Sequence, residues 1–321
     1  MTIILSQQQI KDFQKEILDW YRKNQRDLPW RKSHDPYSIL ISEVMSQQTQ
    51  ISRVVPKYEV WMEKFPTLQS LAEAPTSEVL RYWSGLGYNR RALYLQRLAK
   101  ELVGQSSLRE VKRRSSPGHP SEKGLPHKQS LLAMTQKEHV WPQTEEELKK
   151  LPGIGEYTAR AILCFAFDRQ IAVVDTNVRK VILVRFKDVI LNICEGSQLA
   201  DRKEILRFTQ NDKEKQIIQN LATELLPKGR AYEWNQALMD YAAAELKAHK
   251  IPLPKQSKFN DSDRYYRGQI LKVLLEKHSV SEEELQALFL QKISDERMKK
   301  VLLSLKKDLF IVVKKGKIEL C

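Results

Sequence analysis

Cysteine is scarce in this chain. Its 321 residues include only three, Cys164, Cys194 and Cys321, and their wide spacing excludes a disulfide framework and a cysteine cluster that would bind a metal. Long apolar runs are also missing, since none approaches the roughly 18 residues that a transmembrane helix needs. The apolar stretch Ile3–Leu5 is too short for the core of a signal peptide. We therefore expect a cytoplasmic protein.

Alternating Val and Ile residues are rare before residue 308, which argues against a large sheet. Apolar residues instead recur at three- and four-residue steps, the spacing of an amphipathic helix. Thr67, Thr76 and Thr144 mark boundaries where such helices would begin. The expected helices are residues 7–23, 37–52, 54–64, 76–83, 89–103, 144–150, 156–167, 175–186, 216–226 and 233–247. The pattern predicts a mainly α fold.

Two polar stretches interrupt this periodicity, residues 104–139 and 194–215. Both are interpreted as surface insertions between helices. The basic run Lys112–Arg114 in the first could touch a DNA backbone, but a solvated loop is the preferred interpretation. Residues 248–262 contain two prolines and are expected to form a linker. The predicted domains are therefore a core over residues 1–247 and a small unit over residues 263–321.

The C-terminal unit has the pattern of a winged helix. Helices are expected over residues 264–277, 281–291 and 294–306, followed by short strands at 309–313 and 318–320. The turn between the strands, Lys314–Lys317, carries three lysines and a glycine. Winged helices bind DNA in many proteins and serve as protein contacts in others, so both roles stay open.

Acidic residues are outnumbered by basic ones. The chain has 54 Lys and Arg against 40 Asp and Glu, a net charge of +14. A surplus of this size suggests a polyanionic partner such as DNA or RNA. Lysine-rich helix surfaces without any such partner are the alternative.

The segment Leu151-Pro-Gly-Ile-Gly-Glu-Tyr-Thr joins two predicted helices. Gly153 and Gly155 allow backbone conformations and close approaches that side chains would block. Such a turn leaves the backbone N–H groups of the next helix pointing outward, where they can bind a DNA phosphate. This segment predicts a helix-hairpin-helix, with a purely structural helical turn as the alternative.

Two carboxylates are candidates for catalysis. Asp175 ends the apolar segment Ala172-Val-Val-Asp and stands just before Asn177 and a basic helix. Taken alone it is best explained as a helix N-cap, but next to a phosphate site it could stabilise positive charge at a sugar C1′. Glu43 lies among apolar residues of an expected helix, where partial desolvation would raise its pKa toward that of a general acid. An ordinary exposed glutamate is the alternative.

Ordered motifs run through most of the chain before the linker. They are Leu28-Pro-Trp-Arg, Asp35-Pro-Tyr, Ser42-Glu-Val-Met-Ser-Gln-Gln-Thr-Gln, Gly85-Leu-Gly-Tyr, Leu151-Pro-Gly-Ile-Gly-Glu-Tyr-Thr, Val174-Asp-Thr-Asn-Val and Trp234-Asn-Gln-Ala-Leu-Met-Asp. Together they resemble the MutY family of adenine DNA glycosylases in the helix-hairpin-helix superfamily. Those enzymes remove adenine mispaired with guanine or 8-oxoguanine. The resemblance covers about residues 8–250, apart from the two insertions.

The resemblance implies a role for each matching residue. Glu43 matches the general acid that protonates the adenine leaving group, and Asp175 matches the carboxylate that stabilises the oxocarbenium ion. Tyr157 and Asn177 match a tyrosine and an asparagine of the active site. Because Tyr157 stands where lyase-type relatives keep a Schiff-base lysine, strand cleavage is expected to be absent.

The resemblance also implies the residues that meet DNA. Gln48 and Tyr88 match residues pushed into the duplex around a flipped base, and the polar run around Gln48 suits contacts with base edges. Three residues near the N-terminus match the wall of the base pocket. The full expected set is Arg26, Trp30, Arg31, Gln47, Gln48, Thr49, Tyr88, Gly153 and Gly155.

Three departures from the family pattern alter what is expected. The positions of the four cysteines that usually bind an iron–sulfur cluster hold Leu246, Leu253, Gln256 and Ser262, so no cluster and no other cofactor or metal is expected. Ser46 replaces a usual leucine beside Gln48. The winged-helix unit takes the place of the Nudix-like domain that recognises 8-oxoguanine in typical members.

The expected protein is a two-lobed helix-hairpin-helix glycosylase core with a small winged-helix domain. Its expected activity is hydrolysis of the glycosidic bond of mispaired adenine, acting as a monomer on double-stranded DNA that holds a mismatch or an oxidised base, near the nucleoid and not at a membrane. Two alternatives stay open: a related glycosylase for uracil or thymine opposite guanine, and a DNA-binding protein without catalysis.

Overall fold

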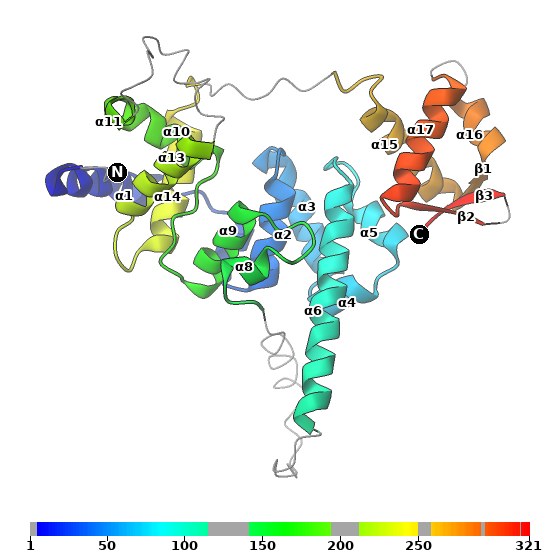
Figure 1. Ribbon diagram of the computed structural model, residues 1–321, viewed down its shortest axis with the longest axis horizontal. Coiled ribbons are helices and arrows are strands. Elements are labelled where there is room, and N and C mark those ends of the chain that lie inside the picture. The colour runs from blue at the N-terminus through cyan, green and yellow to red at the C-terminus, as the bar shows by residue number, and fades with distance from the viewer. Residues whose placement is uncertain (1–4, 115–140, 194–211, 250–257, 290–292, 315) are drawn as a thin grey trace. The chain divides into compact units, whose positions relative to one another are not determined.

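A computed structural model describes residues 5–114, 141–193, 212–249, 258–289, 293–314 and 316–321 (Figure 1). Most of the described residues are helical, which confirms the prediction of a mainly α protein. The chain divides into two compact units. The first comprises Met1–Glu43, Pro142–Lys150 and Ile154–Pro254, and the second Val44–Trp141, Leu151–Gly153 and Lys255–Cys321. This division differs from the predicted one, a core over residues 1–247 and a small unit over residues 263–321. The predicted domain boundaries stay a prediction.

Every regular element in the described part of the first unit is a helix. Its elements are α1 (Gln7–Asn24), a 3-10 turn (Pro29–Lys32), the first part of α2 (Pro36–Ser46), α8 (Glu145–Leu148), α9 (Glu156–Phe167), α10 (Thr176–Arg185), α11 (Lys187–Ile193), α13 (Asp212–Glu224) and α14 (Ala231–Glu245). A capping box at Ser6 begins α1, because its hydroxyl accepts from Gln9 N–H while the Gln9 side chain accepts from Ser6 N–H.

The core of the first unit lies around α14, which packs against α1 and α10. Trp234 of α14 is almost fully buried, and its ring meets Phe13 of α1 edge to face at 5.6 Å. Phe13 meets Phe186 in the same way at 5.1 Å. Buried aromatic pairs of this geometry stabilise a fold beyond the area that they bury. They join α1 and α14 to the end of α10, the helix whose N-cap is Asp175.

The second unit combines a helical part with the C-terminal residues. Its elements are α3 (Ile51–Lys64), α4 (Leu68–Glu73), α5 (Thr76–Trp83), α6 (Arg90–Arg114), α15 (Asp263–Lys277), β1 (Ser279–Ser281), α16 (Glu282–Phe289), α17 (Asp295–Lys307), β2 (Ile311–Lys314) and β3 (Lys317–Leu320). Its helical part packs α4 and α5 against α6. Trp61 lies edge to face with Phe65 and with Trp83, and all three are buried.

The C-terminal residues that the structure describes, from Asp263 on, form three helices and a three-stranded antiparallel sheet with strand order β1-β3-β2 (Figure 1). Val280 of β1 pairs with Ile318 of β3, which in turn pairs with Val313 of β2. The predicted helices and the two final strands are all found, while β1 was not predicted. A strand of three residues offers too little alternation to be distinguished from a turn.

Several predicted boundaries were wrong. The helix expected over residues 37–52 ends at Ser46, and a turn separates it from α3. The short helices α4 and α11 were not predicted. Part of each expected insertion is helical: α6 continues through Lys112–Arg114 to its end, and α13 begins at Asp212. Lys, Arg, Glu and Gln propagate helices well without apolar periodicity, which explains both extensions. The rest of both insertions lies outside the described residues.

Candidate active site

Glu43 and Tyr157 are joined by a direct hydrogen bond in the first unit. Glu43 lies in the last turns of α2, and Tyr157 lies in the first turn of α9. The phenol hydroxyl of Tyr157 donates to Glu43 Oε2 at 2.7 Å. The structure therefore places side by side two predicted site residues that are 114 positions apart in the chain.

The surroundings of Glu43 change its acidity. Burial raises the pKa of Glu43 from 4.5 to about 7, and the negative charge of Asp175 adds to the rise. The hydrogen bond from Tyr157 and the positive charge of Arg31 act in the opposite direction. A carboxyl group with a pKa near 7 can hold a proton at neutral pH and donate it. The side chain is thus not the ordinary exposed glutamate that was the alternative.

Asp175 is the N-cap residue of α10. Its Oδ1 accepts from the N–H groups of Asn177 at 2.8 Å and Val178 at 2.7 Å, and its Oδ2 accepts from the Asn177 side-chain amide at 2.8 Å. Burial raises the pKa of Asp175, and these three hydrogen bonds oppose the rise. The cap and the catalytic interpretation are compatible, because a cap also fixes the orientation of the carboxylate.

Arg26 and Arg31 converge on one buried carboxylate, Asp240, at the end of the Trp234 motif. Arg26 Nε donates to Asp240 Oδ1 at 2.6 Å, and the Arg31 guanidinium donates to both Asp240 oxygens at 2.7 and 2.8 Å. Burial raises the pKa of Asp240, but the hydrogen bonds and charge of Arg31 outweigh it and the net pKa is lowered. Trp30, the third residue predicted to line the base pocket, lies between the two arginines in the sequence and is also buried.

Asp240 was not predicted as a site residue, although its motif was noted. Arg26 lowers the pKa of Asp175, and Arg31 lowers that of Glu43, so the two arginines act on both candidate carboxyls. Asp240 fixes the positions of both guanidinium groups and so the places from which their positive charges act on Glu43 and Asp175. An acidic residue in the otherwise apolar run Ala237-Leu-Met was the signal that could have found it.

Asn235 was also missed, and it holds the segment that leads to Asp175. Its Oδ1 accepts from Val173 N–H at 2.8 Å, and its Nδ2 donates to the carbonyl of Ile171 at 3.0 Å. The same amide donates to the Ala231 carbonyl at 2.8 Å. Residues 171–175 belong to no helix or strand, so this buried amide satisfies backbone groups that lack partners in regular structure.

The predicted hairpin lies between α8 and α9. Gly153 has φ 80°, and a Cβ there would come within 2.8 Å of Tyr94 Cβ, so a side chain does not fit. Gly155 is the N-cap of α9 and provides no side-chain cap. The N–H groups of the first turn of α9 are therefore not taken by a capping side chain, as a phosphate-binding helix end requires.

Gln48 and Tyr88, the residues predicted to insert into the duplex around a flipped base, belong to the second unit. Gln48 and Tyr88 each occupy a turn tip with positive φ, 53° and 48°, and both side chains are exposed. Gln47 and Thr49 flank Gln48, and the Thr49 hydroxyl donates to the Gln47 carbonyl at 3.1 Å. The candidate catalytic residues Glu43 and Asp175 thus belong to the first unit, and the residues predicted to insert into the duplex belong to the second.

The residues at the four family cluster positions do not fit an iron–sulfur cluster. Leu246 is buried in the apolar core of the first unit, and the hydroxyl of Ser262 caps α15 by accepting from Tyr265 N–H. Leu253 and Gln256 lie outside the described residues. Cys164 is buried and accepts a hydrogen bond from Asn235. In the part of the chain that the structure describes, no group of three His, Cys, Asp or Glu residues is placed to hold a metal ion.

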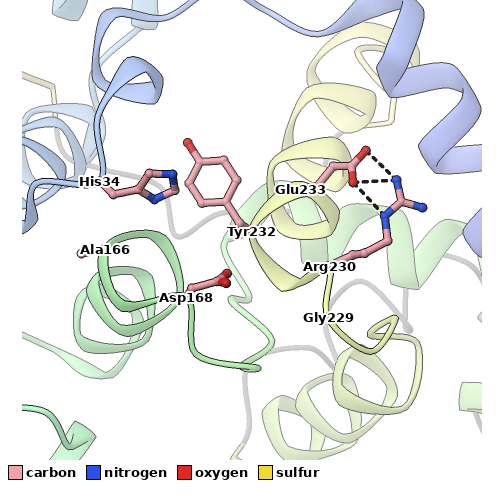
Figure 2. Close-up of a pocket in the computed structure, with 7 residues that line it drawn as sticks. All are labelled: His34, Ala166, Asp168, Gly229, Arg230, Tyr232 and Glu233. Carbon is pink, nitrogen blue, oxygen red and sulfur yellow. Dashed lines mark hydrogen bonds and ion pairs between the residues drawn. The ribbon is translucent and has the colours of Figure 1, made fainter.

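A pocket of about 400 Å³ opens elsewhere in the first unit (Figure 2). Arg230 and Glu233 form an ion pair at its edge at 2.6 Å, and the rings of His34 and Tyr232 lie 5.0 Å apart. Its lining residues are His34, Ala166, Asp168, Gly229, Arg230, Tyr232 and Glu233. None of them is a predicted site residue, so the candidate site rests on the side chains around Glu43.

Among the described residues, no helix is long and apolar enough to cross a membrane.

Residues 41–185 match the HhH-GPD superfamily of base excision DNA repair proteins. The adenine DNA glycosylase of Mycolicibacterium smegmatis is 39% identical over 168 residues, which are 52% of this chain and 47% of that protein. The adenine DNA glycosylase of Mus musculus is 34% identical over 271 residues, 80% of this chain and 43% of that protein. The chain thus spans less than half the length of these two relatives.

Solved structures share the fold. A thermostable thymine-DNA glycosylase is 24% identical with a TM-score of 0.55, over 76% of this chain and 90% of that one. A trapped endonuclease III–DNA covalent intermediate is 19% identical with a TM-score of 0.51, over 77% and 91%. The predicted helix-hairpin-helix glycosylase fold is confirmed. Its motifs, its fold and these relatives agree: the chain resembles the MutY-type adenine DNA glycosylases, and residues 41–185 carry the match to the HhH-GPD superfamily of base excision DNA repair proteins.

Proposed function

We propose that this protein hydrolyses the glycosidic bond of adenine mispaired with guanine or 8-oxoguanine in double-stranded DNA. One observation carries the proposal: two carboxyl groups in one unit have different environments. Glu43, with a pKa near 7, is suited to donate a proton, while Asp175 is held by three hydrogen bonds. Pairs of carboxyls whose environments separate their roles are typical of glycosyl transfer.

Glu43 acts first in the proposed reaction. Its proton passes to a ring nitrogen of the flipped adenine, so that the C1′–N bond breaks and the base leaves with the bonding electron pair. Tyr157 keeps the carboxyl oriented through its hydroxyl at 2.7 Å. Burial, together with the charges of Glu43 and Asp175, raises the pKa of Tyr157 well above 10, so its hydroxyl stays protonated.

Asp175 acts on the charge that remains. As the base leaves, positive charge develops at C1′, and a fixed carboxylate nearby stabilises it. Water then adds at C1′, and its proton can be taken up by the carboxylate that Glu43 has become. No amine stands at Tyr157 to form an imine, so the enzyme is proposed to act without cleaving the strand.

DNA binding is proposed to use both units. The N–H groups at the start of α9 would bind a phosphate, and the net charge of +14 favours a polyanion. Gln47, Gln48 and Thr49 with Tyr88 would meet the bases around the extruded adenine, since a base inside the stack is out of reach of the catalytic groups. The enzyme is proposed to act as a monomer near the nucleoid.

A panel of duplexes tests this function. Single-turnover base release is measured on A·G, A·8-oxoguanine, T·G and U·G duplexes of one sequence. We expect adenine release from the first two and neither thymine nor uracil release. Release from T·G or U·G alone would assign the chain to the other mismatch branch. Binding without release from all four would make it a DNA-binding protein without catalysis.

No cofactor is proposed for the reaction. The donor set at the cluster positions lacks thiolates, so protein purified under anaerobic conditions should be colourless, contain no iron and keep its Tm in a chelator. Iron in stoichiometric amount, or a visible charge-transfer band, would contradict this proposal.

The C-terminal residues are proposed to bind the phosphate backbone through the lysine turn between β2 and β3. Lysine–phosphate contacts add affinity without sequence preference. One contact favours a second role: Arg264 of α15 donates to the Tyr88 hydroxyl at 3.3 Å. Removing residues 263–321 distinguishes the two. A uniform loss of affinity supports the backbone role, whereas a selective loss of discrimination between A·G and A·8-oxoguanine supports a role in recognising the opposite base.

A further inference from the structure

Arg91, in the first turn of α6, links two turns that are distant in sequence. Its guanidinium Nη1 donates to the carbonyls of Val44 at 2.7 Å, Met45 at 3.2 Å and Gln47 at 2.7 Å. Its Nη2 donates to the carbonyls of Leu86 and Gly87, both at 3.1 Å. A single side chain therefore holds the turn that carries Gln48 and the turn that carries Tyr88.

The first of these turns needs such a donor. Because α2 ends at Ser46, the carbonyls of Val44 and Met45 belong to its last turn, where helical partners are missing. Many helices end on a glycine in the left-handed region, but here Gln48 takes up positive φ, 53°. The Arg91 guanidinium satisfies the carbonyls and puts a positive charge at the negative end of the helix dipole.

The second turn is held in a similar way. Gly85, Gly87 and Tyr88 all have positive φ, and Tyr88 is the one that pays the steric cost of a side chain. The Arg91 guanidinium carbon lies 5.5 Å from the centroid of the Tyr88 ring and 5.1 Å from that of Trp83. Trp83 Nε1 also donates to the Gly87 carbonyl at 2.9 Å. Left-handed non-glycine residues persist only where their surroundings hold them.

Arg91 differs from an ordinary surface arginine in its burial and in its pKa. Only 9% of Arg91 is exposed, and burial lowers its pKa to about 10. Both terminal nitrogens of this desolvated guanidinium make hydrogen bonds to carbonyls, while its buried Nε makes none. By contrast, the residues that it fixes present their side chains outward, and Tyr88 is 43% exposed.

We propose that Arg91 is a positioning residue that sets Gln48 and Tyr88 together as a rigid pair for insertion into the duplex around the extruded base. The proposal rests on the function proposed above, because it requires that a base leave the stack. It assigns Arg91 no contact with the adenine and no part in proton transfer. Its effect should therefore fall on extrusion and not on the chemical step.

Arg91→Lys is the main test, because lysine keeps the charge but cannot span both turns with one planar fork. Single-turnover adenine release is compared on an A·8-oxoguanine duplex and on the same adenine in a single-nucleotide bulge, where unstacking costs less. We expect a loss of about 30-fold on the duplex and less than about threefold on the bulge. Arg91→Met, which removes the charge, should show the same difference at a greater overall loss.

Two controls make the result specific. Arg81→Lys, an exposed arginine of α5, should leave both rates within about twofold. Fluorescence of 2-aminopurine at the target position reports unstacking without base release, and Arg91→Lys should reduce its rise. The Tm of each variant shows that the protein under assay is folded.

Three results would overturn the positioning role. They are equal losses on duplex and bulge, an unchanged duplex rate, and an Arg91→Lys protein that is unfolded at the assay temperature, which would make Arg91 purely structural. The proposed function fails separately, if the wild-type protein releases adenine from neither substrate and produces no rise in 2-aminopurine fluorescence.

Discussion

Replacing Glu43 by glutamine should abolish base release and stabilise the fold at neutral pH. Glutamine keeps the shape of the side chain and can still accept the Tyr157 hydrogen bond, but it cannot donate the proton that the leaving base needs. It also removes a carboxylate that burial disfavours. Function and stability are therefore expected to change in opposite directions, which a merely disruptive substitution would not do.

The magnitude follows from the raised pKa. The folded-state pKa of Glu43 is about 7 against 4.5 unfolded, so between these values the folded protein binds more protons and loses stability as pH rises. The full shift corresponds to at most about 3 kcal/mol, and to about 2 kcal/mol after allowance for partial exposure to solvent. The penalty is complete above pH 7 and absent well below pH 4.5, where both states are protonated.

Urea unfolding at pH 8 and pH 4 measures the effect. The Glu43→Gln protein should be about 2 kcal/mol more stable than wild type at pH 8 and nearly equal to it at pH 4. Glu59→Gln, on an exposed position of α3, should match wild type within about 0.5 kcal/mol at both values. If Glu43→Gln were less stable than wild type at pH 8, the assignment of Glu43 as a desolvated carboxyl would be wrong.

Three further predictions follow from the same contacts. Asp175→Asn should abolish base release while leaving duplex affinity within about tenfold, because asparagine still caps α10 but carries no charge for the transition state; release near the wild-type rate would leave Asp175 a helix cap. Asn235→Leu should lower the free energy of unfolding by about 2–3 kcal/mol, since Val173 N–H and the Ile171 carbonyl lose their buried partner, and urea unfolding without any change would contradict that role. Removing residues 263–321 should flatten the salt dependence of binding by about two to three units of log K per log salt, and an unchanged slope would exclude the lysine turn as a phosphate contact.

Much of the secondary structure was predictable because its signals are local. The bounds of α9 and α5 agree with the expected ranges, and caps such as Thr144 begin their helices through hydrogen bonds to residues three positions away. The end of α2 was not predictable in this way. Apolar periodicity extended the expected helix to residue 52, but α2 stops at Ser46, where Arg91, more than 40 positions later, donates to the last carbonyls.

For the candidate site, too, some features could be predicted from the sequence and others could not. Sequence by itself determined which residues are available: the two carboxyls Glu43 and Asp175, the glycines of the hairpin, and the absence of thiolates at the cluster positions. Only the tertiary structure decided what they meet. The pKa of Glu43 depends on burial and on Tyr157, and the positions of the Arg26 and Arg31 guanidinium groups depend on hydrogen bonds to Asp240, more than 200 positions away. Electrostatic energies depend on distance in space and on exclusion of water, and neither is encoded in the spacing of residues along the chain.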